Sequence, residues 1–72
     1  MKLPDIEVVA AKVHEAWMDT KRSHGVSTRK SESGEELMVE YAQLSETAKE
    51  LDRSSVRAVY RAIESLAEEK SV

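Results

Sequence analysis

Three side chains suited to binding a ligand occur at helical spacing near the N-terminus: His14, Trp17 and Lys21. Residues three and four positions apart lie on the same side of a helix, so these three would share one flank. An indole can stack on a nucleobase, while a nearby imidazole and ammonium group can bind ribose or phosphate. The alternative is a Trp17 that packs in the core or in a dimer interface, where tryptophan is also enriched, and the residue type alone favours that interpretation.

A row of arginines at four-residue spacing, Arg53, Arg57 and Arg61, is the second candidate feature. Like charges at this spacing repel by roughly 0.2–0.5 kcal/mol per pair. The planar guanidinium suits phosphate, so the row would serve as an anion-binding ridge. We favour the alternative, in which Glu64 and Glu68 on the same side of the helix neutralise the charge of the arginine row. The candidate ligand-binding residues are therefore His14, Trp17, Lys21, Tyr41, Arg53 and Arg57.

Catalytic and metal-binding patterns are missing from the sequence. His14-Glu15 begins like the zinc motif of metalloproteases, but the second histidine of that motif would fall where this chain has Met18. General acid–base catalysis needs a convergent partner and a pocket, which no pattern here indicates. We expect no enzyme activity, no metal and no cofactor, and we expect His14 to form hydrogen bonds within the fold.

The composition indicates one small domain over residues 1–72. A chain of this length buries only about 60% of its unfolded surface, so we expect self-association, as a homodimer, to add stability. Without cysteine or a long apolar run, we expect the chain in the cytoplasm and away from membranes. The net charge of −3 disfavours nucleic acid. The basic cluster of Lys21, Arg22, His24, Arg29 and Lys30 lacks an aromatic residue and is a weak signal for it.

The first predicted element is a helix from Ile6 to about Gly25. Pro4 suits its first turn, and Gly25 can adopt the left-handed conformation that ends a helix. Apolar residues at helical spacing would form its inner stripe: Ile6, Val9, Ala10, Val13, Ala16 and Trp17. In this prediction Val13 belongs to the core, and His14 lies with Trp17 on the flank.

The rest of the chain is predicted as a loop, a short irregular segment and more helix. Residues 26–34 lack periodicity and read as a loop, and residues 35–44 should pack Leu37 or Met38, Tyr41 and Leu44 onto the first helix. A helix beginning at Ser45 should bend or restart near Asp52, where cap-forming residues occur, with Asp52 capping it or pairing with Arg53. The last helix, about 54–70, would bury Val56, Val59, Tyr60, Ile63, Leu66 and Ala67. We predict an all-α fold of two long amphipathic antiparallel helices.

Several runs in the chain resemble the RyR domain, the repeat found in ryanodine-receptor calcium channels and in small bacterial and phage proteins. They are Ile6-Glu7-Val8-Val9-Ala10, His14-Glu15-Ala16-Trp17, Met38-Val39-Glu40-Tyr41-Ala42-Gln43-Leu44 and Ser45 through Asp52-Arg53. The resemblance covers residues 6 to about 66. The chain departs from the family in its middle: Val26-Ser27-Thr28 replaces a Trp and a Tyr-Gly pair, and Glu35-Glu36 stands near the usual His-Pro.

The resemblance implies a non-enzymatic, α-rich module of the single-repeat prokaryotic or phage type. Because the channel repeats pair about a pseudo-twofold axis, it also implies a homodimer. It further suggests a role in sensing or sequestering a nucleotide-derived ligand. Two alternatives remain open. One is a structural or protein-interaction module without a small-molecule ligand, and the other is a weak nucleic-acid binder acting through the basic loop.

Overall fold

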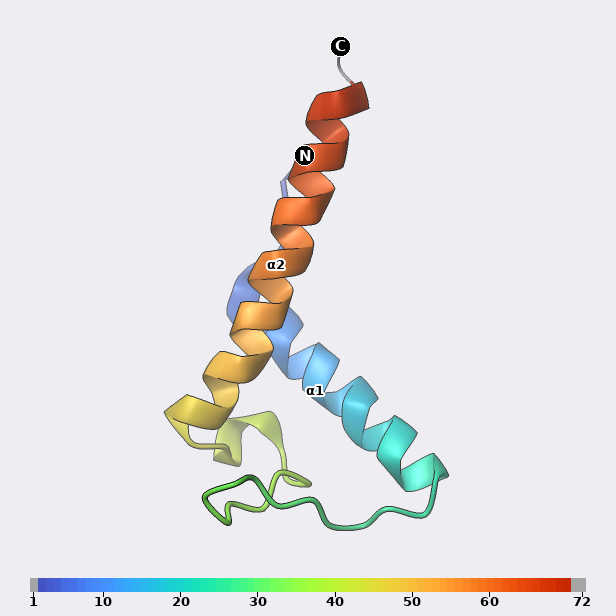
Figure 1. Ribbon diagram of the computed structural model, residues 1–72, viewed down its shortest axis with the longest axis vertical. Helices are drawn as coiled ribbons and strands as arrows, with labels where there is room; N and C mark the ends of the chain where they lie inside the picture. Colours follow the sequence, from blue (N-terminus) through green and yellow to red (C-terminus); the bar gives the residue numbers. More distant parts are fainter. Residues whose placement is uncertain (1, 71–72) are drawn as a thin grey trace.

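Two helices make up most of the computed structural model, which describes residues 2–70. Helix α1 spans Ile6–Ser23, the 3-10 turn η1 spans Tyr41–Gln43 and helix α2 spans Glu46–Lys70 (Figure 1). In the described part of the chain there is no strand, only an isolated bridge between Lys30 and Glu36. The predicted all-α class is confirmed. Within residues 2–70, neither helix is both long enough and apolar enough to cross a membrane.

Both ends of α1 are capped. The Asp5 carboxylate accepts a hydrogen bond from the Glu7 amide (3.1 Å), which makes Asp5 the N-cap. The prediction that Pro4 lies in the first turn is therefore wrong, because the helix begins only after this cap. At the other end the amides of Gly25 and Val26 donate back to carbonyls of the last turn (2.9 Å each), with Gly25 at φ 79°. This is a Schellman motif, and the predicted role of Gly25 is confirmed.

The buried stripe of α1 is rotated from the predicted one. It consists of Ala10, His14 and Met18, while Val13 is 41% exposed. The prediction that Val13 lies in the core and His14 on the flank is wrong. The reason is tertiary: α2 and the segment before it both approach the His14 side of α1. His14 tolerates this burial because its ring nitrogens face polar groups there.

Helix α2 is continuous, so the predicted bend or restart at Asp52 is wrong. The Ser45 hydroxyl accepts a hydrogen bond from the Ala48 amide (3.2 Å) and caps the first turn. Ser54 and Ser55, which read as cap-forming residues, instead bond within the helix: Ser54 donates to the Glu50 carboxylate and Ser55 to the Leu51 carbonyl. Their hydroxyls therefore leave the backbone pattern intact.

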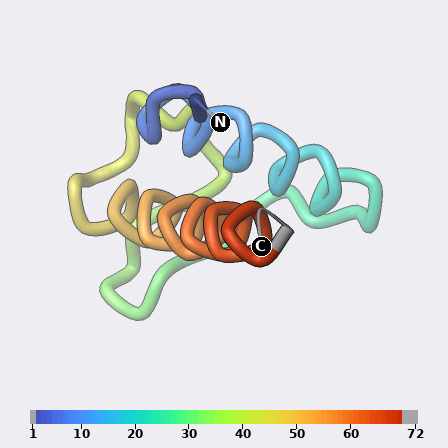
Figure 2. Tube along the Cα trace, turned by 90° about the horizontal axis from the view of Figure 1, so that it is seen from above, coloured from blue at the N-terminus to red at the C-terminus, as the bar shows by residue number. Residues whose placement is uncertain are grey.

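The helices run in opposite senses but cross, so they do not pack along their full lengths. Tyr60 of α2 donates to the Pro4 carbonyl (2.8 Å) at the start of α1, and Arg53 contacts Glu7. Beyond the crossing, the last turns of α1 move away from α2 (Figures 1 and 2), whereas Leu3, which precedes α1, lies near Glu64 and Ala67 of α2. The predicted inner face is consequently buried only in part, since Leu66 is 58% exposed. The core is small: Ala10, His14, Met18, Leu44, Ala48 and Val56.

Two acidic residues organise the loop between the helices. The Glu36 carboxylate accepts hydrogen bonds from the Thr28 hydroxyl and from the amides of Arg29 (2.7 Å) and Met38 (3.0 Å). Glu35 accepts from both the amide and the hydroxyl of Ser45 (2.8 and 2.7 Å). Glu35 and Glu36 thus build this part of the loop from carboxylate hydrogen bonds.

The molecule is more open than a compact monomer of its size. Its radius of gyration is 14.7 Å, against about 11 Å for a compact chain of this length. Its accessible surface is 5427 Å², whereas the size relation for monomeric proteins gives about 4,500 Å² at this mass. The excess, about 900 Å², arises because much of each helix has no neighbour.

Glu36 makes the stability of the loop pH-dependent. Hydrogen bonds from the Arg29 amide, the Thr28 hydroxyl and the Met38 amide lower the pKa of Glu36 from 4.5 to about 2. A lowered pKa in the folded state gives stability that is present above pH 4.5 and is lost as the pH falls toward 2. Glu36→Gln should therefore flatten the decline of urea-unfolding stability between pH 4.5 and 2. Glu32→Gln, in the same loop, should leave the decline unchanged, and equal behaviour of the two variants would contradict this assignment.

Candidate functional site

A cavity of about 430 Å³ opens between α1, the start of α2 and the chain around Leu37. Its polar lining comprises His14, Trp17, Lys21, Arg29, Asp52 and Ser55, and its apolar lining comprises Val13, Leu37, Leu44, Ala48 and Leu51. Three of the six predicted ligand residues, His14, Trp17 and Lys21, therefore lie together. Whether they bind a ligand remains a prediction.

His14 forms the floor of this cavity and is only 4% exposed. Its Nε2 lies 2.7 Å from the Val39 carbonyl oxygen. A carbonyl can only accept, so Nε2 carries a proton and donates it. On the other side, Nδ1 lies 3.6 Å from a carboxylate oxygen of Asp52. Burial raises the pKa of Asp52, and the nearby His14 opposes that rise. The prediction that His14 forms hydrogen bonds within the fold is confirmed.

Trp17 is the half-buried wall of the cavity. Its ring stacks against His14, with centroids 5.5 Å apart and planes inclined by 23°. Lys21 follows Trp17 by four residues, and its Nζ lies 5.9 Å from the centre of the indole. That distance is near the limit of a cation–π contact. The long side chain of Lys21 can therefore leave the ring at small cost.

Two further residues complete the polar lining, and neither was among the predicted site residues. Arg29 reaches the cavity from the loop, and Asp52 reaches it from the second turn of α2. Arg29 belonged to the basic cluster that was only a weak signal for nucleic acid, and nothing in the sequence gives the path of the loop. The position of Asp52 on the inner side of α2 could have been found from the sequence, because Asp52 lies four residues from both Ala48 and Val56, which are buried. Its position on that stripe outweighs its tendency to cap a helix.

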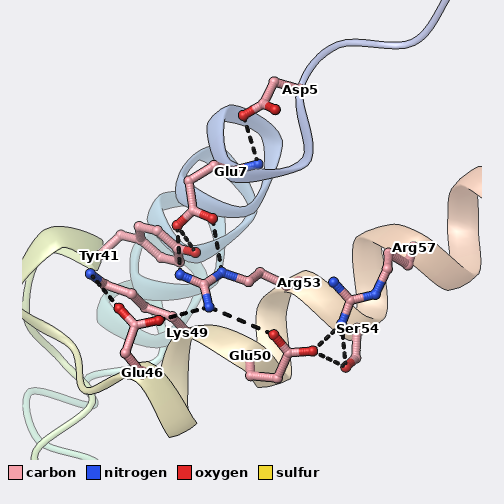
Figure 3. Close-up of polar contacts among 9 residues, drawn as sticks. All are labelled: Asp5, Glu7, Tyr41, Glu46, Lys49, Glu50, Arg53, Ser54 and Arg57. Atoms are coloured by element: carbon pink, nitrogen blue, oxygen red, sulfur yellow. Dashed lines mark hydrogen bonds and ion pairs between the residues drawn. The ribbon is translucent and has the colours of Figure 1, made fainter.

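Arg53 lies elsewhere, at the centre of an ion-pair cluster that joins the helices (Figure 3). It donates through Nε and Nη2 to the Glu7 carboxylate (2.8 and 3.0 Å) and through Nη1 to Glu46 (3.0 Å). The Tyr41 hydroxyl donates to the same Glu7 carboxylate (2.6 Å). Arg53 and Tyr41 lower the pKa of Glu7, and burial and Glu7 raise the pKa of Tyr41.

Arg57 is occupied within α2, where it donates to the Glu50 carboxylate and to the Ser54 hydroxyl (Figure 3). The expected neutralisation of the arginine row by Glu64 and Glu68 is therefore wrong for Arg53 and Arg57, whose partners are Glu7, Glu46 and Glu50. Neither arginine lines the cavity. Tyr41 also lies outside it, on the far side of His14, with ring centroids 6.3 Å apart.

The predicted basic cluster is divided in the folded chain. Lys21 lies over Trp17, whereas Arg22 pairs with Asp19 (3.3 Å) on the exposed side of α1. Arg29 turns into the cavity. In addition, residues 2–70 contain no group of three or more side chains that could hold a metal ion. The candidate site is therefore an aromatic wall with two cations and one carboxylate.

His14 should be a major source of stability. Its replacement in His14→Ala leaves the Val39 carbonyl without a donor and opens space in a small core, which should cost about 2 kcal/mol. His14→Gln, which keeps an N–H donor, should recover part of that loss. Denaturant unfolding measures both, with the exposed His24→Ala as the matched control. Equal effects at His14 and His24 would rule out the structural role.

Arg53 and Arg57 offer a comparison between an ion pair across helices and one within a helix. Arg53→Gln should lower the melting temperature more than Arg57→Gln, because only Arg53 ties α2 to α1. The difference should shrink at about 0.5 M NaCl, where exposed charges are screened. Melting curves followed by circular dichroism test this, and an equal loss in both variants would refute it.

Comparison with known proteins identifies the family. The family model of the RyR domain matches residues 4–68. Neither the search of curated proteins nor the search of solved structures found a match. The matched range includes α1, the loop with Glu35 and Glu36, η1 and nearly all of α2, so it contains every residue of the cavity. The resemblance seen in the sequence is thereby confirmed: this chain belongs to the RyR domain family.

Proposed function

We propose that this RyR domain is a non-enzymatic binding module of the single-repeat prokaryotic or phage type, and that it binds a nucleotide-derived ligand. The observation that carries the proposal is the cavity in which Trp17 meets Lys21, Arg29 and Asp52. Its volume of about 430 Å³ falls in the usual range for small-molecule sites, roughly 300–1,000 Å³.

The lining suits the three parts of a nucleotide. A base stacks on Trp17, which contributes about 1–3 kcal/mol per base in proteins that bind single strands. Lys21 leaves the indole and, with Arg29, binds phosphate, for which ammonium and guanidinium groups are suited. The Asp52 carboxylate accepts a hydrogen bond from a ribose hydroxyl. His14 holds this wall in place through Val39.

The non-enzymatic part of the proposal is supported by the state of His14. It is the general acid–base candidate in the cavity, and its Nε2 is committed to the Val39 carbonyl while its Nδ1 faces Asp52. Among the described residues, Val39 and Asp52 are the hydrogen-bond and ion-pair partners of that ring. A ring held in this way serves to position Trp17.

We also propose that the module acts as a homodimer. The excess surface of about 900 Å² and the exposed apolar side chains Val13, Leu51, Val59 and Leu66 support this. The same features favour a second function, a protein-interaction module without a small ligand, because Val13 and Leu51 lie at the cavity itself.

Ligand binding can be tested by fluorescence and thermal shift, with Trp17 as the single indole reporter. AMP, ADP, ADP-ribose and cyclic nucleotides should be titrated to millimolar concentration. We expect at least one to quench Trp17 and to raise the melting temperature, since a ligand at about 100 times its Kd adds about 2.7 kcal/mol. No shift with any of them would remove the nucleotide proposal and leave the protein-interaction alternative.

Variants locate the site. Trp17→Ala should weaken binding about 5- to 160-fold, the equivalent of one stacked base, and thermal shift must follow this variant because the reporter is lost. Lys21→Ala and Arg29→Ala should weaken phosphate-bearing ligands more than the free nucleoside. Arg22→Ala, which removes a neighbouring cation paired with Asp19, is the matched control. An effect at Arg22 as large as at Lys21 would point to general charge attraction.

A further inference from the structure

We infer that two copies of this chain associate through one uncharged face of α2, antiparallel about a twofold axis, and that the partner's helix closes the ligand cavity. This deepens the homodimer part of the proposed function by naming its surface. The face consists of Leu51, Ser55, Ala58, Val59, Ala62 and Leu66, called the α2 face below. All six residues are exposed.

The α2 face is free of charge along about four turns of helix. At about 100° per residue, its six members fall within one sector, and every charged residue between positions 47 and 66 lies outside it. The ion pairs of Arg53 and Arg57 lie on the opposite side of α2 (Figure 3). In a chain with 35% charged residues, an uncharged face of this length indicates burial against a partner.

The excess surface of the whole chain, which both helices share, is large enough for a dimer interface. The chain exposes about 900 Å² more than a compact monomer of its mass. A standard stable interface removes about 800 Å² from each partner. Leu51, Val59 and Leu66 are each more than half exposed, at 66%, 56% and 58%, and so leave apolar area available for that burial.

The order of residues on the α2 face indicates that its binding partner is a second copy of this chain rather than another protein. A twofold interface buries the same patch on both subunits, so the patch must complement itself when reversed. About a centre between Ala58 and Val59, Leu51 lies opposite Leu66 and Ser55 lies opposite Ala62. The small side chains at Ser55, Ala58 and Ala62 let two helices approach closely, with a leucine pair at each end.

The same arrangement bears on the ligand site. Leu51 and Ser55 belong to the α2 face and also line the cavity. The cavity lining includes Val13 and Trp17 of α1 as well. A partner helix on the α2 face therefore lies across the side of the cavity that is open in a single chain. The partner's Leu66, placed opposite Leu51, becomes part of the wall.

Sedimentation of the full chain tests the interface. We expect a dimer for the unmodified chain and a monomer for Ala62→Arg, with self-association weakened about a hundredfold or more because two charges enter an apolar interface. Glu64→Arg, two residues away on the opposite side of α2, should remain dimeric. Circular dichroism must show equal helix content in both variants. A monomeric unmodified chain at about 1 mM, or a dimeric Ala62→Arg, would overturn the inference.

Cross-linking tests the orientation of the two helices. Because the chain has no cysteine, an introduced cysteine is the only thiol that can react. An equal mixture of chains carrying Leu51→Cys and chains carrying Leu66→Cys should form a disulfide-linked heterodimer under mild oxidation. Either variant alone should stay unlinked, because the equivalent positions are about 15 residues, or about 22 Å, apart along antiparallel helices. Linkage of Leu66→Cys to itself would show a parallel pair and refute the proposal.

The two proposals fail separately. A dimer that binds no nucleotide removes the ligand and keeps the interface. If a nucleotide binds, Ala62→Arg should weaken it about tenfold or more, because the cavity loses its partner wall, whereas Glu64→Arg should not. Equal affinity in the two variants would show that the partner does not close the cavity.

Discussion

The hydrogen bond from His14 to the Val39 carbonyl is the contact on which the rest of this small structure depends. It joins the middle of α1 to the irregular segment before η1, and Asp52 on the opposite side of the ring brings in α2. The apolar core is too small to fix these three elements by itself, because its other buried members in the described chain are two alanines, a methionine, a leucine and a valine. A buried imidazole with both nitrogens facing polar groups fixes the relative orientation of these elements, because hydrogen bonds are directional and apolar contacts are not.

Around this contact the molecule has two unlike sides. On one side Arg53, Glu7 and Tyr41 form a polar cluster that ties α2 to the first turn of α1. On the other side Trp17, Lys21 and Arg29 surround a cavity that opens toward exposed apolar residues. The first side fixes how the helices cross, and that crossing is what leaves the second side open. The residues of the polar cluster and those of the candidate cavity are thus separated, with His14 between them.

Two glutamates organise the middle of the chain. Glu36 gathers three donors from the loop and Glu35 holds the cap of α2, so the turn is built from carboxylate hydrogen bonds. This turn also places Arg29 and Leu37 at the cavity. The loop therefore provides a cation, Arg29, to the candidate site.

The sequence by itself determined the local features whose causes are local. The helical periodicity of residues 6–23, the cap at Gly25 and the all-α class follow from side-chain spacing and backbone preference. That His14, Trp17 and Lys21 lie close together along one side of α1 follows from the turn of a helix. The tertiary structure decided which side of each helix is buried. It placed His14 inside and Val13 outside, carried α2 unbroken through Asp52, gave Arg53 to Glu7, and brought Arg29 from the loop to Trp17. These choices depend on how two helices cross, which long-range contacts set and which periodicity in a single chain does not encode.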